Sequence, residues 1–267
     1  MKNKFNYPEK ALNDFKVSLD TYGWVVYENA IESDFINRIN NDIEDGYIRR
    51  KSIQERNGIS ANMDGIHYHL LDRDNFSIPL LERMYCNEEI TQYFGGKHIL
   101  NGMNGAIYSK QECPYQNNMH RDASTFISKT KLLLQMIITL DDFTLQNGAI
   151  YFLSGSHKTA LKPDEEFFYT HADSVVTPKG SIILFNSNLW YANGENVTPE
   201  PRRALILGFT QPFLKQQMDY SRFLGYDFVA GLKPELRQII GYNACIPANL
   251  SDYYQPPHLR MYKHDQS

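Results

Sequence analysis

The sequence predicts a mainly β protein, an all-β sandwich or barrel with helices packed against its outside. From about Asn104 onward, short runs rich in Val, Ile, Leu, Phe and Tyr alternate with Gly, Asn, Asp and Pro, which is typical of sandwiches and barrels. The preceding part shows helical periodicity instead. The chain has 267 residues and is 42% hydrophobic, enough to bury a sizeable core. We therefore predict one domain, residues 1–267, with a β core over about 104–212.

Two amphipathic helices are expected before the β core. The first follows Pro8, carries apolar residues on one face and ends at Gly23, and a strand over residues 24–27 follows it. The second is expected to begin with Ser33 or Asp34 as its cap. The apolar residues that define the two helical faces are Leu12, Phe15 and Leu19, then Phe35, Ile36, Ile39 and Ile43. Residues 50–66 are polar and lack periodicity, which is typical of a surface loop and also of an active-site lid.

Six runs have the composition of strands. They span residues 106–109, 132–140, 149–153, 173–177, 181–185 and 204–210. Alternate residues of a strand share a face, so Gln135, Ile137 and Thr139 are predicted to lie together. The polar groups of Gln135 and Thr139 then point into the barrel, which indicates a pocket lined by polar side chains. After a helix at residues 234–240, the Pro- and Tyr-rich tail is expected to wrap the barrel.

Charge and cysteine content exclude several classes of partner. Lys and Arg total 27 against 31 for Asp and Glu, a net charge of -4, so no overall basic field attracts nucleic acid or an anionic membrane. The three cysteines, Cys86, Cys113 and Cys245, fit neither a disulfide framework nor a zinc knuckle. No apolar leader and no run of about 18 apolar residues occurs. A small-molecule partner and a cytoplasmic location are expected.

The most informative short motif is His120-Arg121-Asp122. In an extended strand, two residues separated by one position point to the same face, so the imidazole and the carboxylate can hold one cation. This ligand pair suits Fe(II) and leaves positions open for a co-substrate and oxygen. The triplet is short enough to occur often by chance, so its weight depends on the segments that come after it in the chain.

Several ordered segments resemble the phytanoyl-CoA hydroxylase family. Thr139 to Ile150 and then Leu153 to Lys158 are similar to a strand, loop and turn of that family. Gly180 to Phe185, Leu189 to Asn196 and Pro201 to Ala204 look like its distal ligand strand and co-substrate arginine. Leu236 to Tyr242 and Tyr253 to Pro257 look like bacterial members. The resemblance covers about residues 19–257.

The resemblance implies a double-stranded β-helix, or jelly roll, that binds Fe(II) and 2-oxoglutarate. It assigns His120 and Asp122 as the first two metal ligands. Arg202 would pair with the far carboxylate of 2-oxoglutarate, since a guanidinium binds a carboxylate through two hydrogen bonds. The neighbouring arginine, Arg203, is interpreted as a plain surface charge. Further residues assigned to the co-substrate are Asn193, Tyr108, Lys110 and Thr139. Gln135, Phe126 and the segment 50–69 are expected to contact the substrate.

The sequence departs from the family at the distal ligand, where Tyr191 stands in place of histidine. Three outcomes remain open. In the first, Tyr191 ligates iron or leaves that position to water, and the protein still oxidises its substrate. In the second, another histidine (His171, His67 or His69) supplies the missing imidazole. In the third, the protein has lost turnover and remains as a binding protein, or the tyrosine was introduced deliberately into a working enzyme. A phenolate is a hard anion that favours Fe(III) over Fe(II).

The function predicted from these features is oxidation of a small molecule by O2, coupled to 2-oxoglutarate, by hydroxylation or a related C–H oxidation. A role in bacterial secondary metabolism is expected. The alternative is a catalytically silent or altered relative that binds metal, 2-oxoglutarate or a metabolite.

Overall fold

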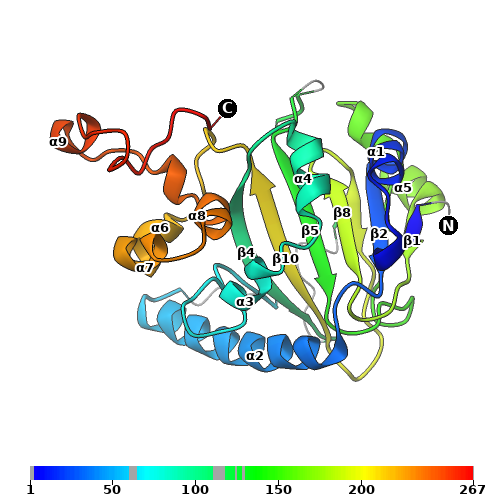
Figure 1. Ribbon diagram of the computed structural model, residues 1–267. Helices are drawn as coiled ribbons and strands as arrows, with labels where there is room; N and C mark the ends of the chain where they lie inside the picture. Colours follow the sequence, from blue (N-terminus) through cyan, green and yellow to red (C-terminus); the bar gives the residue numbers. More distant parts are fainter. Residues whose placement is uncertain (1–2, 60–64, 111–117, 124, 128–129, 267) are drawn as a thin grey trace.

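The chain forms two β-sheets that pack against each other, with helices on the outer face of the larger sheet (Figure 1). The computed structural model describes residues 3–59, 65–110, 118–123, 125–127 and 130–266. The larger sheet has the order β1-β2-β8-β5-β10-β4-β3, and the smaller has the order β7-β6-β9. The strands are β1 (Lys4–Asn6), β2 (Trp24–Glu28), β3 (Ile66–His67), β4 (Ile99–Tyr108), β5 (Leu133–Thr139), β6 (Ile150–Phe152), β7 (Asp173–Val175), β8 (Ile182–Asn186), β9 (Tyr191–Asn193) and β10 (Arg202–Thr210).

The register of the larger sheet decides which side chains reach the space between the sheets. Strand β10 pairs antiparallel with β4 and β5, and Arg202 lies opposite Tyr108. On β5, Leu134, Met136 and Ile138 belong to the core under the helices, whereas Ile137 packs toward the smaller sheet. The alternation predicted for residues 132–140 is therefore present, because successive side chains of a strand point to opposite faces.

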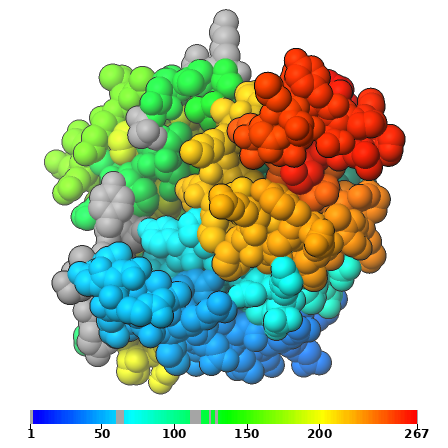
Figure 2. Space-filling model, turned by 90° about the vertical axis from the view of Figure 1, so that its left-hand side faces the viewer, coloured from blue at the N-terminus to red at the C-terminus, as the bar shows by residue number. Residues whose placement is uncertain are grey.

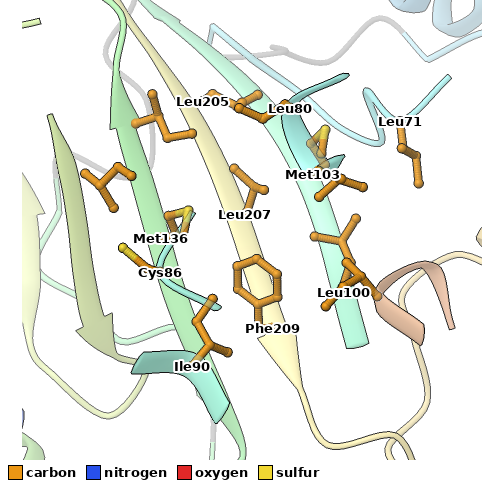
Figure 3. Packing of buried hydrophobic residues seen from close by; sticks show 14 of the residues in the cluster. Leu71, Leu80, Cys86, Ile90, Leu100, Met103, Met136, Leu205, Leu207 and Phe209 are labelled. Carbon is orange, nitrogen blue, oxygen red and sulfur yellow. The ribbon is translucent and has the colours of Figure 1, made fainter. Parts of the chain in front are cut away.

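Helices cover the face of the larger sheet that turns away from the smaller one. The helices of the chain are α1 (Leu12–Thr21), α2 (Ser33–Arg56), α3 (Ser77–Glu82), α4 (Asn87–Phe94), α5 (Glu165–His171), α6 (Tyr220–Leu224), α7 (Tyr226–Ala230), α8 (Pro234–Ile240) and α9 (Leu250–Tyr253). Two of them do not cover this face: α5 packs on the smaller sheet through Phe168, and α9 is largely exposed. Figure 3 shows side chains of β4, β5 and β10 in this outer core, with Ile90 and Cys86 from the region of α4 beside Met136. The helices make up more of the chain than the description mainly β suggests, but the jelly-roll prediction is confirmed.

The N-terminal elements follow the sequence prediction, with two differences. Helix α1 and strand β2 occur where expected, and Phe15 and Leu19 are buried. Helix α2 runs to Arg56, so residues 50–56 are helical and the loop predicted there was wrong. The cap is Glu32 rather than Ser33 or Asp34, and its side chain makes no capping hydrogen bond. The expected lid also includes residues 60–64, which lie outside the described residues.

The C-terminal part lies beside the β3/β4 edge of the larger sheet. Helix α8 forms over residues 234–240 as predicted, and it contacts β4. Figure 2, which looks onto this edge, shows the chain from gold to red on the upper right of the face. The segment after Cys245 leaves Ile246, Leu250 and Tyr254 largely exposed. It therefore lies at one edge and does not wrap the barrel as expected.

The described residues hold no helix with both the length and the apolar character needed to cross a membrane. Two of the cysteines are free thiols, the buried Cys86 and the half-buried Cys245. The third, Cys113, lies outside the described residues.

Candidate active site

The predicted metal pair lies between the sheets, next to strand β9. His120 and Tyr191 form an antiparallel bridge, with His120 N donating to Tyr191 O at 2.9 Å and Tyr191 N donating to His120 O at 3.0 Å. The Nδ1 of His120 lies 2.7 Å from the carbonyl oxygen of Asn118. A carbonyl only accepts, so Nδ1–H donates to it, a bond that metal-binding histidines commonly make, and Nε2 is the ring nitrogen assigned to a metal.

Asp122 accepts hydrogen bonds at both carboxylate oxygens. The Tyr191 hydroxyl donates to Oδ1 at 2.8 Å, and Gln135 Nε2 donates to Oδ2 at 2.9 Å. Burial raises the pKa of Asp122 above its ordinary value, and the bond from Tyr191, the charge of His120 and the bond from Gln135 oppose that rise. The structure thus brings His120, Asp122, Tyr191 and Gln135 together, as the sequence predicted.

Arg202 sits in a fully buried position beside this group. Its side chain is 1% exposed and lies between the rings of Tyr108 and Phe143, with its guanidinium carbon 4.4 and 4.3 Å from their centroids. It donates to the carbonyl oxygen of Gly148 and, at 3.1 Å, to Asn193 Oδ1. Burial lowers the pKa of Arg202 to about 10, so the guanidinium stays charged at neutral pH.

A small pocket extends from Tyr191 to Arg202. Tyr191, Asn193, Tyr108 and Arg202 line it together with Ile137, Phe143, Ile150, Phe185, Ala204 and Ile206. The walls are mainly apolar with a few polar groups, as in most small-molecule sites. Within the described part of the chain, Arg202 Nε is buried and has no hydrogen-bond partner, so the pocket offers a cationic donor to an anionic ligand.

The donor set also fits a metal. Two ligand oxygens about 2.1 Å from a six-coordinate cation lie about 3.0 Å apart when they subtend a right angle. The Tyr191 hydroxyl and Asp122 Oδ1 are 2.8 Å apart. The phenol oxygen and the carboxylate oxygen are thus spaced as two neighbouring ligands of one ion are.

The alternative histidine ligands lie elsewhere. His67 is buried against the ring of Tyr47, His69 contacts the Tyr220 hydroxyl at 3.0 Å, and His171 bonds to the carbonyl of Phe167 on its own helix. Among the described residues, no three His, Cys, Asp or Glu side chains are placed to hold a metal ion. No histidine in the described ranges replaces the family's distal ligand.

Three predicted site residues are not part of this group. The Thr139 hydroxyl donates to the carbonyl of Pro178 at 2.8 Å and accepts from Ser181 N at 3.0 Å, so it bonds to the turn before β8, and Thr139 is absent from the described pocket lining. Lys110 is exposed just beyond β4 and is absent from the described pocket lining. Phe126 is half-buried, and the guanidinium carbon of Arg121 lies 5.3 Å from its ring centroid.

The sequence predicted Asn193 and Tyr108 near Arg202, but it did not predict the other two partners of Arg202, Phe143 and Gly148. Phe143 packs on the guanidinium and Gly148 supplies a carbonyl. Both lie in the segment 139–150, which resembled the family, but no periodicity marks either as facing the site. Arg203, by contrast, forms an ion pair with Asp141 at 3.0 Å and is held at the surface.

Known proteins resemble this chain in sequence and in fold. The sequence model of the family "Phytanoyl-CoA dioxygenase (PhyH)" matches residues 19–204. An uncharacterised protein of Mycobacterium tuberculosis is 33% identical over 171 residues, 63% of this chain and 63% of that protein. The chain thus spans less than two thirds of that relative's length.

Two further matches carry functional descriptions of their own. The dioxygenase trt7 of Aspergillus terreus is 34% identical over 122 residues, 41% of this chain and 40% of that protein. The crystal structure of SnoK, described as a non-heme alpha ketoglutarate dependent carbocyclase from nogalamycin biosynthesis, superposes with a TM-score of 0.59 at 13% identity. It covers 77% of this chain and 85% of that chain. At this identity the likeness establishes the shared fold.

Proposed function

The chain belongs to the phytanoyl-CoA dioxygenase (PhyH) family, and on that premise we propose that it is an oxygenase dependent on iron(II) and 2-oxoglutarate. It uses O2 to oxidise a C–H bond of a small molecule. His120, Asp122 and Tyr191 hold the metal, and Arg202 with Asn193 and Tyr108 binds 2-oxoglutarate.

The observation that carries this proposal is the buried guanidinium of Arg202. A cation enclosed by two aromatic rings, with no carboxylate bonded to it in the described ranges, is costly unless an anion joins it. The pocket between Arg202 and Tyr191 offers that anion a place. A dicarboxylate can reach the guanidinium with one end while its other end faces His120 and Asp122.

Bound iron with 2-oxoglutarate supplies the O2 activation, and the chain's own residues do the rest. Arg202 orients the co-substrate, because a guanidinium fixes both the position and the plane of a carboxylate. Ile137, Ile206 and Phe185 exclude water from the pocket, which strengthens the electrostatic interactions inside it. Gln135 fixes the plane of the Asp122 carboxylate through the 2.9 Å hydrogen bond.

The finer part of the proposal concerns the metabolic role. We infer a substrate of secondary metabolism, in a bacterial setting. Support comes from segments of this chain that look like bacterial relatives, and from a structural neighbour whose own description places it in nogalamycin biosynthesis.

A second candidate is a binding protein without turnover. It is favoured by the two hydrogen bonds that Asp122 accepts from Tyr191 and Gln135, since they satisfy both oxygens of the carboxylate in the absence of a metal. In that case the pocket would still bind an anion at Arg202.

Anaerobic titration with iron(II) and 2-oxoglutarate distinguishes the two. The oxygenase is expected to give the weak visible charge-transfer band of a chelated complex, and 2-oxoglutarate should tighten iron binding. Absence of both effects would refute the oxygenase proposal in favour of the binding protein.

The iron(III) form tests Tyr191. A ligating phenolate gives an intense visible band that Tyr191→Phe abolishes. The matched control is Tyr151→Phe, because Tyr151 packs against Tyr169 on the other side of the smaller sheet and should leave the band unchanged. An iron(III) form without the band in the wild type would remove Tyr191 from the ligand set.

A further inference from the structure

A row of amide side chains continues from Asp122 across the inner face of the larger sheet. Gln135 on β5 lies opposite Gly208 on β10, and Gly208 lies opposite Gly102 on β4. Directly paired residues of an antiparallel sheet share a face. The amide strip, as we call this surface, consists of Gln135, Gly208, Gly102, Asn101, Asn104 and Gln217.

Gln135 is the link between the metal ligand and the strip. A carboxylate only accepts hydrogen bonds, so the group that Gln135 turns toward Asp122 must be the NH2 of its amide. The carbonyl oxygen Oε1 consequently points the other way. It is shielded from solvent and has no hydrogen-bond partner among the described residues.

The position of that oxygen is fixed by Gly208. A Cβ built on Gly208 would lie 3.1 Å from Gln135 Oε1, which means that the oxygen lies directly over the bare backbone of β10. A side chain at this position would therefore crowd the acceptor.

The rest of the strip leads toward the surface. A Cβ on Gly102 would meet Gln217 Oε1 at 2.9 Å, and Asn104 Nδ2 lies 3.8 Å from the same point. The register shift between Gly208 and Phe209 leaves Asn101 without a partner on β10, and the Asn101 Cβ lies 3.8 Å from the Cβ position of Gly208. Such bulges commonly turn a side chain toward an active site.

The strip therefore runs from the half-buried Asp122 to the exposed Gln217. Its polar side chains are neutral amides, and Leu133 lies beside Gly208. A buried acceptor without a donor is unfavourable, so a ligand that supplies an O–H or N–H gains more than one that does not. Sites of this kind discriminate strongly against analogues that lack the donor group.

We propose that the amide strip is the substrate-binding surface and that Gln135 Oε1 accepts a hydrogen bond from the substrate. The substrate is accordingly a neutral polar molecule with hydroxyl or amide N–H groups next to the carbon that is oxidised, and not a long acyl chain. This inference rests on the proposed oxygenase function, because it assumes that the substrate is oxidised next to the metal that Asp122 would hold.

Saturation-transfer NMR on the full chain with bound 2-oxoglutarate tests the inference. The probes are methyl β-glucoside and N-acetylglycinamide, which carry O–H or N–H donors, and methyl decanoate, which carries an acyl chain and no donor. The two donor probes are expected to bind. Gly208→Ala places a methyl group beside Oε1 without removing the Gln135 bond to Asp122, and it should weaken the donor probes about tenfold, the value of roughly one hydrogen bond.

Two controls separate binding from folding. Gly96→Ala adds a methyl group where nothing lies within 4 Å and should leave probe affinity unchanged. Gln135→Leu removes the acceptor and should weaken the donor probes as Gly208→Ala does, with thermal unfolding confirming that each variant is folded.

Failure of the inference is distinguishable from failure of the oxygenase proposal. If neither donor probe binds, if Gly208→Ala leaves their affinity unchanged, or if methyl decanoate binds more tightly than they do, the amide strip is not the substrate surface. The visible charge-transfer band of the complex with iron(II) and 2-oxoglutarate, recorded on the same preparation, tests the oxygenase proposal independently.

Discussion

Replacing Arg202 by methionine separates the binding of 2-oxoglutarate from the stability of the fold. Methionine fills a similar volume between Tyr108 and Phe143 but carries no charge. In the wild type, 2-oxoglutarate at 100 times its Kd should stabilise the native state by about 2.7 kcal/mol. For a chain of this size that corresponds to a rise in Tm of roughly 5 to 10 °C. The variant should show no such rise.

The ligand-free stability of the variant should change little, because two large effects oppose each other. Burial lowers the pKa of Arg202 to about 10, and this shift from the ordinary value corresponds to a cost of about 3 kcal/mol for carrying the charge. The hydrogen bonds to Gly148 and Asn193 return about 1.5 to 3 kcal/mol each. The net change in the free energy of unfolding should therefore stay within about 3 kcal/mol.

Differential scanning fluorimetry with and without 2-oxoglutarate measures both quantities. Arg203→Met is the matched control, because Arg203 is the adjacent arginine and bonds to Asp141 and Glu44 at the surface. It should keep the rise in Tm caused by 2-oxoglutarate. A rise that persists in Arg202→Met, or that disappears in Arg203→Met, would refute the assignment of Arg202.

Three further outcomes are expected. Gly105→Ala places a Cβ 2.2 Å from Nε2 of the buried His67 and should lower the free energy of unfolding by about 1 to 3 kcal/mol. The control Gly96→Ala should leave the free energy of unfolding unchanged. Equal denaturation midpoints for the two variants would contradict this prediction. Burial lowers the pKa of His67 and His98 to about 4, so only the unfolded chain takes up these protons between pH 6.5 and 4. The free energy of unfolding should therefore be highest above pH 6.5 and should fall toward pH 4 by up to about 3 kcal/mol per histidine. Urea unfolding at pH 7 and at pH 5 measures this difference. His98→Phe should make the free energy of unfolding less dependent on pH. Tyr191→His restores the family's ligand and should raise 2-oxoglutarate decarboxylation; unchanged or lower turnover would show that the tyrosine is suited to the reaction.

The fold was predictable where one periodicity dominates a segment. Gln135, Ile137 and Thr139 share a face because strand geometry allows no other arrangement. Residues 50–56 were misread because their polar sequence gives no periodicity, although helix α2 continues through them with Ile48 and Ile53 exposed. A helix that extends past the core keeps its backbone hydrogen bonds without needing an apolar stripe, and pattern alone does not reveal that.

The site was predictable to the extent that strand register determines it. Arg202, Asn193 and Tyr108 converge because β10 pairs with β4 and the short strand β9 faces them. Thr139 faces inward as predicted, yet the turn at Pro178 and Ser181 takes its hydroxyl. Facing inward is a property of the strand, whereas the partner of an inward hydroxyl depends on loops that sequence periodicity does not describe.

Tyr191 shows where sequence and structure must be combined. The sequence places a phenol at the distal position, and the structure holds its ring between His120, at a centroid distance of 4.3 Å, and Phe185, at 5.1 Å. A ring fixed on both sides has little rotational freedom, so the contact between its hydroxyl and Asp122 at 2.8 Å is imposed by packing. Tyr191→Phe keeps that packing and deletes one oxygen, which makes it the variant that distinguishes a ligand from a packing residue. Equal iron affinity in Tyr191→Phe and the wild type would mean that His120 and Asp122 hold the metal without the phenol.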